Sequence, residues 1–88
     1  MKIYKYKIEN NGATIPADAK ILTCQMQDHC LHVWALVDPE THVTAHYDFM
    51  IVGTGHDFEP KDWEYLSTIQ DGPFVWHIWM RKNDWEFS

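Results

Sequence analysis

The chain has 88 residues and a formal net charge of −6. This length accommodates one domain, expected to span residues 1–88, because two halves would each fall near the size at which an isolated core becomes marginal. The acidic balance argues against broad binding to DNA or RNA, which depends on many contacts between Lys or Arg and phosphates. A pocket with two or three donors can still hold a small anion.

The first residues, Met1 to Lys5, lead into a strand-like pattern and not into the apolar region of a secretory signal. No segment approaches the roughly 18 consecutive apolar residues of a membrane-spanning helix. Cys24 and Cys30 do not form a CxxC pair, and we expect both to be buried thiols. These features predict a cytoplasmic protein.

Residues 3–8 alternate in the manner of a half-buried strand, and Asn10-Asn11-Gly12 predicts a turn after them. Residues 15–19 are short and interrupted by proline, so we expect a loop or a single helical turn there. Residues 20–27 alternate again, and the amides on one face suit a ligand wall or a solvated sheet face.

The run from Leu31 to Val37 is continuously apolar and stops at Asp38-Pro39. Its length, its two valines and its tryptophan predict a central strand that is buried on both faces. Proline lacks the N–H that a sheet requires, so the strand is expected to end there.

Residues 42–52 alternate clearly between apolar and polar side chains, which predicts a further strand. Gly53-Thr54-Gly55 follows it. Because glycine permits positive φ and close backbone approach, we expect a tight turn or a bulge at this position. The acidic, proline-containing residues 56–62 predict a loop.

Residues 63–69 fit either a helix that begins after Pro60 or a strand. We prefer the strand, because residues 70–73 form a good hairpin connection to a strand over 74–80. Arg81-Lys82-Asn83-Asp84 is expected to break that last strand. Trp85 and Phe87 then give the tail two aromatic side chains that can dock on this subunit or on a neighbour.

Six short strands at fairly even spacing predict an all-β fold, a small antiparallel barrel or sandwich. Such a sheet has edge strands, and pairing them in a symmetric homo-oligomer is one way to protect them.

Several short motifs follow one another along the chain: Pro16, Ala17, Ile21, Leu22 and Gln25, then Trp34 to Pro39, then Gly53 to Gly55, then Val75 to His77. In this order they resemble a family of small uncharacterised bacteriophage proteins. The resemblance covers nearly the whole chain. It implies phage origin and expression in the cytoplasm of an infected bacterium, and it supplies no catalytic residues. Small phage proteins of this kind often inhibit host defence, some of them by sequestering nucleotide signals.

The six histidines do not show the spacing of a metal site. His42 and His46 share a strand face but lie about 13 Å apart at the rise of a strand. His46 and Asp48 are closer, at about 7 Å between Cα atoms, and His29 to His32 is a loose cluster. None matches zinc spacing, so we expect no metal and no cofactor.

The turn at Gly53 to His56 offers backbone N–H groups and a hydroxyl that can meet a phosphate, although it lacks the Lys and the helix of a P-loop. A purely structural turn is the alternative. By alternation His77 lies opposite Trp76 and shares a face with Trp79, so it is either a hydrogen-bonded core histidine or a ligand contact.

In the ligand-binding interpretation, tryptophan stacks a base, polar side chains hydrogen-bond it, and the guanidinium of Arg81 binds a phosphate. The candidate ligand-binding residues are Gln25, Trp34, Gly53, Thr54, Gly55, His56, Trp76, His77 and Arg81.

No serine lies beside a plausible base, and we assign no catalytic residues. The expected function is non-enzymatic sequestration of a small nucleotide-type immune signal. One alternative is a hydrolase that cleaves such a signal, with His46 and Asp48 or His77 as the general base. Another is a module that docks on a host or virion protein through exposed tryptophans.

Overall fold

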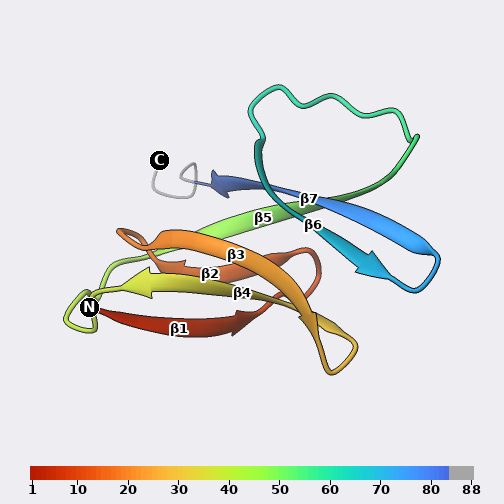
Figure 1. Ribbon diagram of the computed structural model, residues 1–88. Coiled ribbons are helices and arrows are strands. Elements are labelled where there is room, and N and C mark those ends of the chain that lie inside the picture. The colour runs from red at the N-terminus through yellow and green to blue at the C-terminus, as the bar shows by residue number, and fades with distance from the viewer. Residues whose placement is uncertain (84–88) are drawn as a thin grey trace.

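The computed structural model describes residues 1–83, and these form seven antiparallel strands in two sheets (Figure 1). The three-stranded sheet has the order β1-β4-β3, and the four-stranded sheet has the order β2-β5-β7-β6. The all-β prediction is confirmed, and the two layers make a sandwich-like fold, not a closed barrel. The strands are β1 (Lys2–Lys7), β2 (Gly12–Pro16), β3 (Lys20–Gln27), β4 (Cys30–Val37), β5 (Thr44–Gly53), β6 (Glu64–Asp71) and β7 (Phe74–Asn83).

Strand β2 overlaps the loop expected over residues 15–19, so that prediction is wrong for Ile15 and Pro16, whereas residues 17–19 do form a loop. Gly12–Pro16 pairs with β5, and its Ala13 and Ile15 are buried between the sheets. Pro16 is tolerated because β2 is an edge strand and the proline is its last residue.

Two further strand predictions concern the C-terminal half of the chain. The preferred strand assignment for residues 63–69 is confirmed by β6. The expected break at Arg81 is wrong, because Arg81, Lys82 and Asn83 continue β7 and pair with β5. Asp84 and the two tail aromatics, Trp85 and Phe87, lie outside the described residues.

The β3–β4 and β6–β7 hairpins and the connection from β1 to β2 each contain a two-residue turn that uses positive φ. Asn10 and Asn11 have φ of 53° and 59°, and Asp28 and His29 have 53° and 66°. Two successive positive φ values are typical of the hairpin turn whose twist matches that of the flanking strands. Gly72, with φ 58°, precedes Pro73 in the β6–β7 hairpin, as predicted.

The core lies between the sheets. Ile15, Val33 and Ile78 are completely buried, and Ala35 and Phe49 accompany them. In β4 only alternate residues are buried. Trp34 and Leu36 are half-buried on the opposite face, so the prediction of a strand buried on both faces is wrong. Within residues 1–83 no layer covers that face of the three-stranded sheet (Figure 1).

The two cysteines face opposite ways. Cys24 pairs with the buried Val33 and is itself fully buried, whereas Cys30 pairs with Gln27 and is half-buried. Both are free thiols. The prediction of a buried thiol is therefore confirmed for Cys24. For Cys30 it is wrong, because this thiol is only half-buried. The described part of the chain contains no helix of the length and apolarity needed to cross a membrane.

A buried hydrogen bond joins the two sheets where β3 and β6 meet. The Ser67 hydroxyl donates to the Cys24 carbonyl oxygen over 2.7 Å. Because Ser67→Ala leaves this carbonyl without its donor, we expect the free energy of unfolding to fall by about 1 kcal/mol in urea denaturation. Gln70→Ala, on an exposed position of the same strand, is the matched control. Equal effects of the two substitutions would contradict this role of Ser67.

Candidate ligand-binding site

The end of β5 forms the tight turn that the glycines predicted. The N–H of His56 donates to the Gly53 carbonyl over 3.1 Å, and Gly55 has φ 88°. The N–H of Thr54 donates to the Val75 carbonyl over 3.4 Å, which attaches the turn to β7. A Cβ on Gly53 would lie 2.9 Å from His56 Cε1, so glycine lets the imidazole pack over the backbone.

One side of this turn borders a hollow on the exposed face of the four-stranded sheet, which we call the outer cleft. Its volume is about 250 Å³. Histidine and threonine provide its polar surface, and three aromatic side chains provide most of its apolar wall. It is lined by Val52, Gly53, Thr54, Gly55, His56, Phe58, Tyr65, His77 and Trp79.

The polar surface of the outer cleft is a chain of hydrogen bonds centred on His77. Thr54 Oγ1 lies 2.8 Å from His77 Nε2, and Thr68 Oγ1 lies 3.1 Å from His77 Nδ1. The Tyr65 hydroxyl lies 2.5 Å from Thr68 Oγ1. Both ring nitrogens of His77 are therefore engaged by hydroxyls, which fixes the orientation of the imidazole. His77 is hydrogen-bonded as one alternative held, but it lies on the outer face of its sheet and not in the core. Its contact with a ligand stays a prediction.

The aromatic wall of the outer cleft is built around Trp79. Its ring centroid lies 5.1 Å from that of Phe58 and 5.5 Å from that of Tyr65. Trp79 Nε1 is buried and has no hydrogen-bond partner among residues 1–83. A buried indole N–H usually finds an acceptor, so this donor is available to a ligand that reaches it.

The sequence analysis did not select these aromatic residues. Alternation from His77 already placed Trp79 on the same face, and that signal was sufficient to select it. Tyr65 could not be placed, because the β6–β7 register shifts between Tyr65 and Ser67. Phe58 lies in the loop that follows β5, where no periodicity applies.

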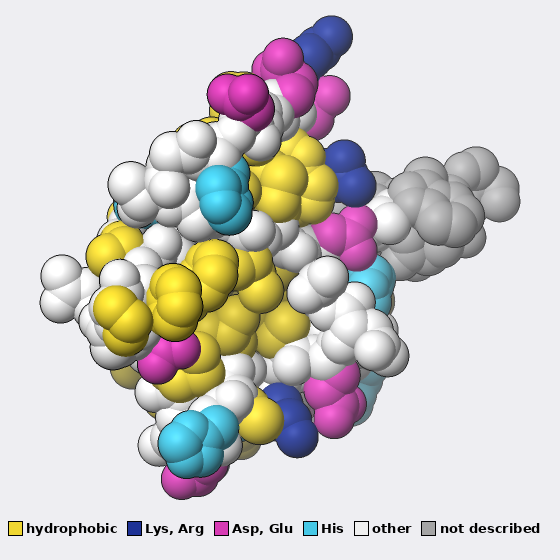
Figure 2. Space-filling view, turned by 90° about the vertical axis from the view of Figure 1, so that its right-hand side faces the viewer, with side chains coloured by type: hydrophobic (Ala, Val, Ile, Leu, Met, Phe, Trp, Pro, Cys, Tyr) yellow, Lys and Arg dark blue, Asp and Glu magenta, His cyan; other side chains and the backbone are white. Residues whose placement is uncertain are grey.

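The other side of the turn borders a second hollow, which we call the end cleft. Its volume is about 440 Å³, and Phe74 and Trp76 stack in it with centroids 5.7 Å apart and planes at 22°. Trp76 also borders a smaller apolar hollow with Met26, Leu31 and Ile51, where the two sheets separate. Figure 2 shows hydrophobic side chains gathered across this end of the molecule. The end cleft is lined by Gly53, Thr54, His56, Pro73, Phe74, Val75 and Trp76.

Six of the nine candidate residues therefore surround one turn, and three do not. Trp34 and Gln25 lie on the exposed face of the other sheet. Arg81 lies four residues along β7 from His77, about 13 Å at the rise of a strand. The nine candidate residues therefore do not line one pocket. The six residues that gather are Gly53, Thr54, Gly55, His56, Trp76 and His77.

Arg81 already has partners in the structure. Its guanidinium lies 4.3 Å from the centroid of the Trp63 ring, and its Nη2 atom lies 3.5 Å from Asp48 Oδ2. His46 Nε2 lies 3.3 Å from Asp48 Oδ1, so the predicted His46–Asp48 pair is present. Asp48 is shared among several donors that link β5 to β7, which gives this group a structural role.

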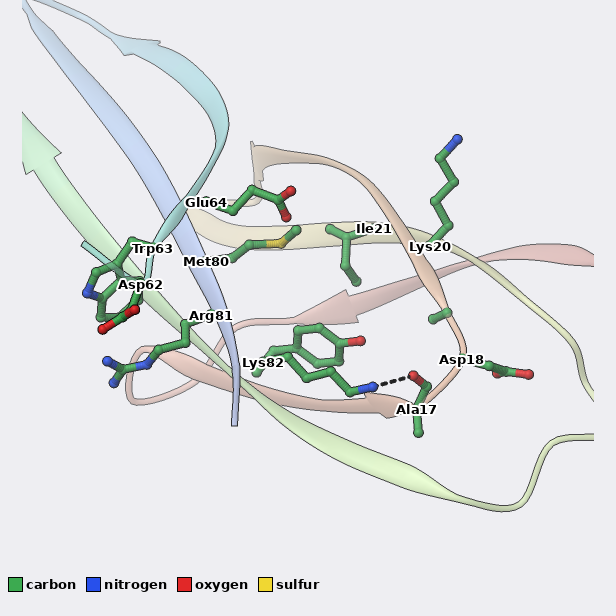
Figure 3. Close-up of a pocket in the computed structure, with 12 residues that line it drawn as sticks. Ala17, Asp18, Lys20, Ile21, Asp62, Trp63, Glu64, Met80, Arg81 and Lys82 are labelled. Atoms are coloured by element: carbon green, nitrogen blue, oxygen red, sulfur yellow. Dashed lines mark hydrogen bonds between the residues drawn. The ribbon is translucent and has the colours of Figure 1, made fainter. Parts of the chain in front are cut away.

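A larger cavity, of about 710 Å³, lies at the other end of the sandwich (Figure 3). Lys82 points across it and donates to the Ala17 carbonyl over 2.8 Å, while the Arg81 guanidinium lies beside Trp63. Acidic Asp62 and Glu64 also line it. Its two cations on β7 thus have partners within the chain, so we place the candidate site at the Gly53–His56 turn.

The described residues contain no group of three or more His, Cys, Asp or Glu side chains close enough to hold a metal ion. Together the fold and the two clefts define a small all-β sandwich domain with an aromatic, histidine-containing candidate site at one turn. The chain belongs to the family described as "Domain of unknown function (DUF7352)", whose model matches residues 1–86. Neither the curated proteins nor the solved structures contain a match to it.

Proposed function

We propose that this protein binds a small nucleotide-type molecule at the Gly53–His56 turn and holds it without cleaving it. The observation that carries the proposal is the hydrogen-bonded Thr54–His77 pair beside the aromatic wall of the outer cleft. A few convergent polar groups in an apolar, concave surface are typical of small-ligand sites. The ring faces would stack the planar base, and the Thr54 hydroxyl and Trp79 N–H would hydrogen-bond its edge.

The charges next to the turn restrict the class of ligand. Asp57 and Glu59 follow the turn directly and are exposed, and Lys61 is the nearest cation in the loop sequence. Two carboxylates near the site oppose a chain of phosphates more strongly than a single phosphodiester. The site therefore favours cyclic nucleotides or nucleoside derivatives over nucleoside triphosphates.

The surroundings of His77 favour binding over catalysis. A general base needs a free nitrogen within reach of the proton that it removes. Both nitrogens of His77 face threonine hydroxyls, and the groups that fix the ring are hydroxyls and not a carboxylate. One observation still supports a hydrolase as the second candidate. The 2.8 Å contact between Thr54 Oγ1 and His77 Nε2 has the separation of a nucleophile and its base.

The biological role within this proposal is the removal of an immune signal in an infected bacterium. Its support is the similarity of the ordered motifs to small bacteriophage proteins, together with a site suited to holding a ligand. Cytoplasmic location and homo-oligomerisation stay predictions of the same proposal. Exposed edge strands and the apolar hollow beside Trp76 give a second copy a surface to contact.

Calorimetry with a panel of cyclic nucleotides and ADP-ribose derivatives tests the proposal. We expect one of them to bind, and we expect Thr54→Val to weaken its binding about tenfold, because one hydrogen bond in a desolvated site contributes about 1 to 1.5 kcal/mol. Thr14→Val, on the exposed side of β2, is the matched control and should bind as the natural chain does.

The fate of the ligand separates the two candidate functions. After incubation the protein is heat-denatured and the released compound is analysed by chromatography. Intact ligand supports sequestration, and altered ligand supports hydrolysis. If no compound of the panel produces heat, the ligand hypothesis fails. Docking on a host or virion protein then becomes the leading hypothesis, and a pull-down from host lysate tests it.

A further inference from the structure

The strands of the three-stranded sheet carry basic residues only, although the protein is acidic. The strands of the three-stranded sheet contain Lys2, Lys5, Lys7 and Lys20 and no Asp or Glu. The whole chain has 13 acidic residues and 7 Lys and Arg residues, so the rest of the molecule carries all the acids and three cations. One sheet is therefore locally basic although the net charge is −6.

The strand register places most of these lysines on the uncovered face of that sheet, which we call the basic face. Lys5 and Thr23 are the cross-strand partners of Trp34, so the three side chains form one row. Lys7 and Gln25 flank His32 in the next row. The row beyond Trp34 consists of Ile3, Leu36 and Lys20.

The centre of the basic face is aromatic and its margins are polar. The Trp34 ring is half-buried, and its centroid lies 6.3 Å from that of His32. The ammonium group of Lys5 donates to the side-chain carbonyl of Gln27, so it reaches across the middle strand. Ile3 is 60% exposed, which extends the apolar part to the margin.

We propose that the basic face binds single-stranded nucleic acid, with a base on Trp34 and phosphates at Lys5, Lys7 and Lys20. Aromatic side chains on a sheet face, flanked by cations that follow the backbone, are the features that such proteins use. The amide of Gln25 and the hydroxyl of Thr23 can hydrogen-bond base edges, a property that an acidic peptide would not require. Stacking on Trp34 needs an unpaired base, which excludes a closed duplex.

This site is separate from the outer cleft and revises the expectation drawn from net charge. The expectation that the protein binds no DNA or RNA assumed that its 13 acidic side chains are spread evenly over the surface. Exposed charges farther apart than the Debye length, about 8 Å at physiological salt, are largely screened from each other. Glu9 is the exception, because its carboxylate lies 3.8 Å from Lys7 Nζ, but both side chains are more than half exposed and a phosphate can replace this weak ion pair. Acidic residues farther away weaken binding at the basic face less than their number suggests.

The number of lysines fixes the expected salt dependence. Three phosphate contacts to a single strand give a slope of about −2 in log affinity against log salt concentration. Between 50 and 200 mM salt the affinity should therefore fall about 20-fold. A much smaller slope would mean that the lysines do not contact phosphates, and this would overturn the proposal.

Fluorescence anisotropy with labelled twelve-residue oligothymidine and oligouridine tests the site directly. Lys7→Glu should weaken binding at least tenfold, and Trp34→Leu should weaken it about tenfold through loss of stacking. Lys61→Glu makes the same change in net charge away from the basic face, and it should change affinity less than twofold. Far-ultraviolet circular dichroism of each variant verifies the fold.

Three results would overturn the proposal. The oligonucleotides fail to bind at 50 mM salt, Lys61→Glu weakens binding as much as Lys7→Glu, or polyglutamate displaces the oligonucleotide as well as unlabelled oligothymidine does. The last result would assign the basic face to an acidic protein partner instead. Thr54 lies in the turn that follows β5 of the other sheet, away from the basic face. Thr54→Val should therefore leave oligonucleotide binding unchanged, whatever its effect in the outer cleft.

Discussion

Replacing Ile78 by alanine is expected to lower the free energy of unfolding by about 3 to 4 kcal/mol, because it removes a large side chain from a closed part of the core. Ile78 is 0% exposed and is among the largest fully buried side chains. Small domains are stable by about 5 to 15 kcal/mol, so this single change would remove a large part of the total. Urea denaturation followed by tryptophan fluorescence measures the loss.

The neighbouring Ile51 provides a matched control for this substitution. Ile51 and Ile78 are direct cross-strand partners, so their side chains leave the same face of the sheet. Ile51 is nevertheless 40% exposed. Ile51→Ala should therefore lower the free energy of unfolding by about 1 kcal/mol. Equal losses at the two positions would contradict the view that the sandwich is closed at Ile78 and open at Ile51.

This difference between two adjacent isoleucines explains where the clefts form. The sheets are in contact over Ile78 and separate beyond it, which leaves Ile51 and Trp76 at the edge of an apolar hollow. The Gly53–His56 turn begins two residues further along β5. The clefts form there because the core ends before the strands do.

Most of the strands could be predicted because their periodicity is local. The bounds predicted for residues 20–27 agree with those of β3, and Asp38-Pro39 does end β4 after Val37. Strand β2 could not be predicted, because its five residues bury only two hydrophobic side chains, those of Ala13 and Ile15, and owe their geometry to pairing with β5. A segment that is stabilised by a distant partner has little signal of its own.

The candidate site was predictable in part for the same reason. Glycine spacing located the turn, and alternation placed His77 on one face of its strand with Trp79. Trp34 does not join this site, because its strand belongs to the other sheet and presents the side chain on the uncovered face. Whether a second layer covers a strand depends on the arrangement of the sheets, and the sequence of that strand does not contain this information.

Stability at alkaline pH should depend on the thiol of Cys24 more than on that of Cys30. Burial raises the pKa of the Cys24 thiol from its ordinary value of 9.0 to about 11. Below pH 9 the thiol is protonated in both the folded and the unfolded chain and has no effect on stability. Between pH 9 and about pH 11 the unfolded chain loses this proton more readily, so the free energy of unfolding should fall by about 3 kcal/mol.

Cys24→Ala isolates this contribution. The substitution leaves a small cavity and so lowers stability by a constant amount at neutral pH. Above pH 9, however, the variant should lose stability less steeply than the natural chain, and the two curves should converge by about 3 kcal/mol near pH 11. Burial and the neighbouring Tyr4 also raise the pKa of Tyr6, but both proteins share that group and its effect cancels in the difference.

Cys30→Ala is the matched control. It keeps Cys24 in place and should retain the Cys24 contribution. Parallel curves of stability against pH for Cys24→Ala and the natural chain would contradict this prediction. They would mean that Cys24 ionises as readily in the folded protein as in the unfolded one, despite its burial beneath the basic face.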